Sequence, residues 1–207
     1  MEMIKDKLLN YRAQALCIKT NVQILKDLWI LQNEFKEKNV RAFYKTVQEN
    51  CIFRIVLEAY KMLYDKTAAN MISNMANSVY QKMLEMEEFK ERKQELLDKK
   101  KSLTSMINSY NRVEEVIVNN RNKVYAHNEQ EFHWFSQSHI DLWEMDDNIY
   151  NSILEISEIC IEYCNGLLGL LGEKSIYEYS NHDDVKRLFG IKTEKDEIHD
   201  LFYGHKK

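Results

Sequence analysis

Two residues suited to phosphate chemistry, Arg121 and His127, stand six positions apart in the run RNKVYAH. Arginine presents a planar, permanently charged fork that matches a phosphate, and histidine exchanges a proton near neutral pH. Either residue alone would say little. The pair together could bind a phosphodiester and help to cleave it.

The run lies at the end of an apolar pattern that predicts one helix over residues 103–127. Six helical residues advance about 600°, so Arg121 and His127 would point about 120° apart and lie about 9 Å apart along the axis. Both then flank a stripe that must be buried. The stripe consists of Met106, Tyr110, Val113, Ile117, Asn120, Val124 and His127.

A joint site therefore needs one of two arrangements. The helix could end near Ala126, so that His127 turns back toward Arg121. Alternatively, the same seam of a second copy could pack here, because a two-fold interface sets one patch against itself and doubles each residue in the shared site.

Composition favours helices along the whole chain. The 207 residues include no proline and five glycines, so little interrupts a helix. A chain of this length can bury one sizeable core, and no linker-like stretch divides it. We expect an all-α antiparallel bundle of about five long helices over residues 1–172, with a polar tail or appendage over residues 173–207.

Hydrophobic spacing locates the other helices. One amphipathic helix is predicted over residues 2–36, and a second over 39–66 carries two apolar stripes, which favours a central position. Further helices are predicted around residues 71–83 and from Asp146 or Asp147 to about Leu171. The charged stretch 90–101 contains interleaved acidic residues and is typical of a solvated helix or a helix connection.

Charge and cysteine content exclude several classes. A net charge of −4 means that contact with nucleic acid must be local. The longest late apolar run, residues 163–172, is too short to span a bilayer, and we expect a cytoplasmic protein without membrane contact. The four cysteines lie in apolar stripes, as reduced core thiols do. Cys160 and Cys164 lack a second close pair, so no metal or other cofactor is expected.

Arg121, Asn122 and His127 resemble the signature of the HEPN superfamily, an arginine followed by a polar residue and, a few positions on, a histidine near a helix end. The local form is also similar to that of the U-type abortive-infection proteins of bacterial phage defence. The segments 43–48 and 62–65 look like their second helix. The resemblance covers about residues 10–170.

This resemblance implies a dimeric, metal-independent endoribonuclease that acts as a toxin or abortive-infection effector. RNA, with tRNA as one candidate, would be cleaved by attack of its own 2′-hydroxyl. His127 would be the general acid or base, and Arg121 would hold the scissile phosphate. Asn122 would orient the histidine or contact the phosphate, and Lys123 would bind a flanking phosphate. A second copy and a cognate antitoxin are the implied protein partners.

The sequence also leaves other interpretations open. In some HEPN toxins a tyrosine two residues after the histidine is modified, but Glu129 stands there, so neutralisation by adenylylation is not supported. Arg121 could simply bridge to a helix carboxylate while His127 caps a helix end. The chain would then be a non-catalytic dimeric scaffold that binds RNA or protein.

Overall fold

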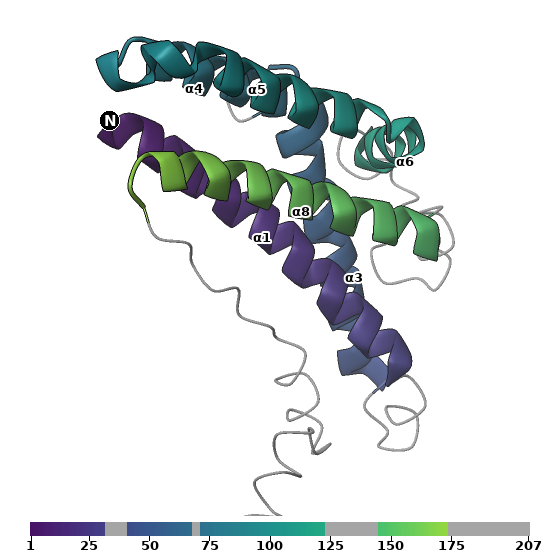
Figure 1. Ribbon diagram of the computed structural model, residues 1–207. Helices are drawn as coiled ribbons and strands as arrows, with labels where there is room; N and C mark the ends of the chain where they lie inside the picture. The colour runs from purple at the N-terminus through teal and green to yellow at the C-terminus, as the bar shows by residue number, and fades with distance from the viewer. Residues whose placement is uncertain (32–40, 68–70, 123–144, 174–207) are drawn as a thin grey trace, which may run out of the picture.

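A computed structural model describes residues 1–31, 41–67, 71–122 and 145–173. These residues form helices and no strand (Figure 1), which confirms the all-α class. The elements are α1 (Glu2–Ile30), α3 (Arg41–Ala59), the π-helix η1 (Tyr60–Tyr64), α4 (Ile72–Leu84), the 3₁₀ helix η2 (Glu87–Arg92), α5 (Lys93–Asn108), α6 (Asn111–Arg121) and α8 (Asp147–Leu170). The two-fold dimer and the boundary between 1–172 and 173–207 stay predictions.

Helices α1 and α8 form an antiparallel pair through the middle of the molecule (Figure 1). Polar contacts show the direction, since Lys5 pairs with Glu173 at 2.6 Å and the Arg12 guanidinium donates to the Asn165 amide oxygen at 2.8 Å. Because α1 also packs against α3 and α4, it occupies the central position that the sequence assigned to residues 39–66.

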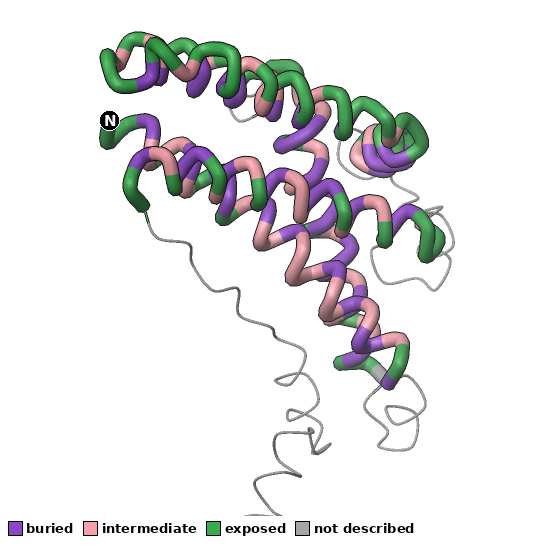
Figure 2. Tube along the Cα trace, in the orientation of Figure 1, coloured by how far each residue is buried: buried purple, intermediate pink, exposed green. Residues whose placement is uncertain are grey.

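Buried residues, most of them apolar, lie on the sides of the helices that are turned toward one another, and exposed residues lie on the outer sides (Figure 2). Both stripes predicted for residues 39–66 contribute to this core, for example Ile55 and Val56, which are fully buried. The thiols of Cys160 and Cys51 lie within it, and burial raises their pKa to about 12 and about 11. All four cysteines are free, as predicted.

The charged stretch 90–101 is a helix connection followed by a solvated helix, as expected. It comprises the end of η2 and the first half of α5, which runs antiparallel to α4 along one edge of the molecule (Figure 1). Phe89 and Leu96 point inward and are buried. Arg92 on the outer side forms a two-pronged pair with Glu95, at 2.8 and 3.2 Å.

The single helix predicted over residues 103–127 is wrong, because the chain turns between α5 and α6 (Figure 1). The Ser109 hydroxyl donates to the Met106 carbonyl at 2.6 Å, and Tyr110 leaves the helical region with ψ 51°. Serine competes for backbone carbonyls in this way and weakens a helix. Met106 is 45% exposed and does not belong to the seam that α6 buries.

Candidate active site at the end of α6

The guanidinium of Arg121, the last residue of α6, lies over the ring of Tyr60, with its central carbon 4.7 Å from the ring centroid. The arginine is half-buried. An aromatic face attracts a cation through its quadrupole without neutralising the charge. The ring therefore fixes where the guanidinium lies and leaves its positive charge in place.

Tyr60 owes its position to the π-helix η1 that closes α3. The Asp65 amide donates to the Tyr60 carbonyl at 2.9 Å, across five residues instead of four. Asp65 then ends the helix and accepts from the amide and hydroxyl of Thr67 at 3.1 and 2.6 Å. Short π-helical turns widen a helix locally and often occur at functional sites.

Asn122 adds a second contact to Arg121. Its side-chain oxygen accepts a hydrogen bond from Nη1 of Arg121 at 3.1 Å. A guanidinium has five N–H donors, so most of them are left for a ligand. Within the described ranges Arg121 forms no ion pair with a carboxylate, so the interpretation in which it bridges to a helix carboxylate finds no support there.

Helix α6 holds Arg121 in place by burying one face. Val113, Val116, Ile117 and Asn120 are buried along that face, which packs against α3, η1 and α8. A cation in the last turn of a helix also interacts favourably with the helix dipole. The predicted seam is therefore confirmed from Val113 to Asn120.

The phenol of Tyr64 lies on the same π-helix, toward the first turns of α6. Burial first, and the charge of Glu114 second, raise its pKa well above the usual range. Tyr64 therefore stays neutral at physiological pH. Its hydroxyl is buried and finds no hydrogen-bond partner among the residues that the structure describes.

The structure thus brings together Arg121 and Asn122 of the predicted site residues. Lys123 and His127 lie outside the described residues, as does Glu129, so neither arrangement proposed for a joint arginine and histidine site is tested. The sequence did not identify Tyr60. The signal for it was the second apolar stripe of residues 39–66, to which it belongs and which faces α6.

The described part of the chain offers neither a cluster of metal ligands nor a membrane-spanning helix. No group of three or more His, Cys, Asp or Glu side chains could hold a metal ion there. No described helix combines the length and the apolar character that crossing a membrane requires.

The described part of the chain is all-α, and the half-buried Arg121 at the end of α6 is followed in sequence by Asn122 and His127, a combination that is typical of HEPN proteins. The family model HEPN AbiU2, described as AbiU2, matches residues 5–188, which include the helical core and the whole run from Arg121 to His127. The chain belongs to this family, a HEPN family of the abortive-infection type. No curated protein and no solved structure matches the chain.

Proposed function

We propose that the protein is a metal-independent endoribonuclease that acts as a toxin or abortive-infection effector. The observation that carries the proposal is the setting of Arg121. Its guanidinium contacts the Tyr60 ring and the neutral amide oxygen of Asn122. No carboxylate among the described residues forms an ion pair with it. A cation held in this way keeps its affinity for an anion such as a phosphodiester.

The reaction follows from the chemistry of RNA. The 2′-hydroxyl oxygen attacks the adjacent phosphorus and gives up its proton to a base, and the bond from phosphorus to the 5′-oxygen breaks as that oxygen takes a proton from an acid. The products carry a 2′,3′-cyclic phosphate and a 5′-hydroxyl. Histidine can serve as base or acid near neutral pH, and we assign this role to His127.

Arg121 would stabilise the negative charge that develops on the phosphate oxygens during the attack. Asn122 would act through Arg121, because its side-chain oxygen already holds one edge of the guanidinium. Lys123 would bind a neighbouring phosphate. One acid and one base are needed in the same step, and a homodimer would supply two copies of His127 to a shared cleft.

Incubation of purified protein with several RNA classes, including tRNA, in the presence of EDTA tests the proposal. We expect cleavage with 2′,3′-cyclic phosphate ends by the wild type and a loss of about 10²- to 10³-fold in a folded His127→Ala protein. Intact RNA in all samples would favour the alternative of a non-catalytic scaffold. Induced expression of both proteins should then give growth arrest with the wild type alone.

A further inference from the structure

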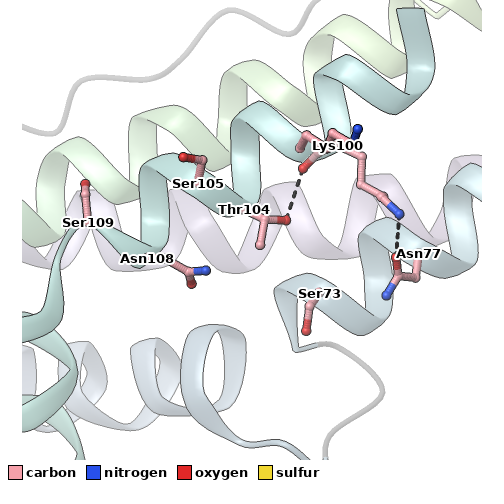
Figure 3. Close-up of a pocket in the computed structure, with 8 residues that line it drawn as sticks. Ser73, Asn77, Lys100, Thr104, Ser105, Asn108 and Ser109 are labelled. Carbon is pink, nitrogen blue, oxygen red and sulfur yellow. Dashed lines mark hydrogen bonds between the residues drawn. The ribbon is translucent and has the colours of Figure 1, made fainter. Parts of the chain in front are cut away.

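A polar groove between α4 and α5 contains a second cation held in the same manner as Arg121. Nζ of Lys100 lies 4.9 Å from the centroid of the Tyr80 ring and donates to the side-chain oxygen of Asn77 at 2.9 Å. Figure 3 shows Lys100 reaching from α5 to Asn77 on α4. An aromatic ring and a neutral amide again hold the cation in place without neutralising it.

The groove has a volume of about 630 Å³, and none of the residues that line it is acidic. Lys101 adds a second positive charge, and the remaining side chains are hydroxyls and amides such as Ser73, Thr104 and Asn108. Ser73 lies on α4 and Thr104 on α5, on the two helices that flank the groove (Figure 3). Lysines fix phosphates, whereas hydroxyl and amide groups hydrogen-bond to phosphate and sugar oxygens. The lining is therefore complementary to a sugar-phosphate backbone.

The groove also lies next to the helix that carries Arg121. Its lining reaches Asn108 and Ser109, where α5 ends, and α6 begins at Asn111 and ends at Arg121. Eleven residues of helix cover about 16 Å. A single strand of a few nucleotides covers that length, so one RNA molecule can contact both places.

We propose that this groove binds the backbone of single-stranded RNA outside the cleaved phosphodiester and thereby positions the substrate. The inference rests on the proposed function for the identity of its ligand. Two charges in a protein of net charge −4 provide the local attraction that RNA binding needs. The lack of an apolar or aromatic wall facing the groove among its lining residues favours recognition of backbone over recognition of bases, which stack on aromatic rings.

Binding is measured with a short fluorescent single-stranded RNA whose 2′-hydroxyls are methylated, so that 2′-hydroxyl attack is blocked. The groove variant is Lys100→Ala/Lys101→Ala. The control is Lys93→Ala/Lys99→Ala, which makes the same change in net charge on the same helix outside the groove. Lys99 belongs to the side of α5 that faces α8. A further variant, Lys101→Glu, leaves the Lys100 contacts intact and should also weaken binding if the double variant does not fold.

Each phosphate contact to a single strand contributes about 0.7 to the slope of log affinity against log salt. Loss of two contacts should therefore flatten that slope by about 1.4 and weaken binding about 25-fold at 0.1 M salt. The control should bind like the wild type. Equal binding by the groove and control variants, or no binding by the wild type, would overturn the inference.

Cleavage of unmodified RNA separates the two proposals. If the groove variant binds more weakly and no protein cleaves RNA, the groove is supported and the nuclease proposal fails. If cleavage occurs and the groove variant has an unchanged affinity, the nuclease proposal is supported and the groove fails. If both hold, the groove variant should cleave with a raised KM and a nearly unchanged kcat.

Discussion

The two ends of α6 carry arginines in opposite surroundings. In the first turn, Arg112 donates to the Asp146 carboxylate at 3.0 Å, and the same carboxylate caps α8 by accepting from the Ile149 amide at 2.9 Å. In the last turn, Arg121 lies on the Tyr60 ring. The helix dipole disfavours a cation near the N-terminus, so a nearby carboxylate stabilises that cation. A cation at the C-terminus is stabilised by the dipole itself and does not require a carboxylate.

This difference separates an arginine that joins helices from one that is available to a ligand. Next to Arg112, Tyr110 donates to Glu155 of α8 at 2.8 Å, so the start of α6 is tied to α8 by two polar contacts. The end of α6 has no such tie through its arginine in the described part of the chain. Polar contacts therefore join the start of α6 to α8, whereas the end of α6 carries an arginine that is available to a ligand.

The largest effect should come from Arg121, with Arg112 as the comparison. Arg121→Ala should lower RNA cleavage by about 10²- to 10³-fold, the usual cost of removing one donor that stabilises transition-state charge. Arg112→Ala should leave cleavage within about twofold, because an exposed ion pair contributes little. Single-turnover cleavage assays of both variants provide the measurement. Similar losses in the two variants would show that net charge matters and position does not.

Asp146→Ala should have the next largest effect, on stability. Loss of an N-cap aspartate costs about 1 kcal/mol, and the same substitution removes the partner of Arg112. We expect the free energy of unfolding, measured by urea denaturation, to fall by about that amount while cleavage at low temperature is kept. A loss of cleavage without a loss of stability would place Asp146 in the active site.

Replacement of Tyr60 should have a smaller effect on activity. Tyr60→Leu removes the aromatic face, worth about 0.5 to 1 kcal/mol for a partly exposed pair, so cleavage should fall roughly two- to fivefold. Tyr60→Phe keeps the ring and should cleave like the wild type. Equal loss in both variants would assign the effect to the phenol hydroxyl and not to the face under Arg121.

Tyr64→Phe should have the smallest effect. Its hydroxyl is buried without a hydrogen-bond partner in the described residues, and removal of such a group is close to neutral or stabilising. The free energy of unfolding should rise or stay within about 0.5 kcal/mol of the wild type, and cleavage should be unchanged. A clear destabilisation would mean that the hydroxyl has a partner outside the described residues.

The helical class and most helix positions could be predicted from the sequence, because apolar spacing reports burial directly. Spacing predicted α8 to within a residue or two and the inward face of α6 from Val113 to Asn120. Spacing did not predict the turn at Ser109 and Tyr110, because the helical spacing of apolar residues continues through that turn. That turn depends on a serine hydrogen bond to the backbone and on the long-range contact of Tyr110 with Glu155.

The same limit applies to the candidate site. Residue types identified Arg121 and Asn122, but the pairing of Arg121 with Tyr60 joins positions far apart in the chain and depends on a π-helical turn. Nothing in the spacing of residues 52–63 marks that turn, because Tyr60 and Leu63 fit an ordinary α-helical stripe equally well. The position of the π-helical turn therefore cannot be read from the spacing of apolar residues.

The most direct test of the central claim, that Arg121 and His127 act together on one phosphodiester, is a double-mutant comparison of RNA cleavage in EDTA. Groups that act as a unit give strongly non-additive losses. We predict that Arg121→Ala, His127→Ala and the double variant have nearly equal residual activity, each far below the wild type. Full activity in either single variant, or losses that multiply in the double variant, would contradict the account.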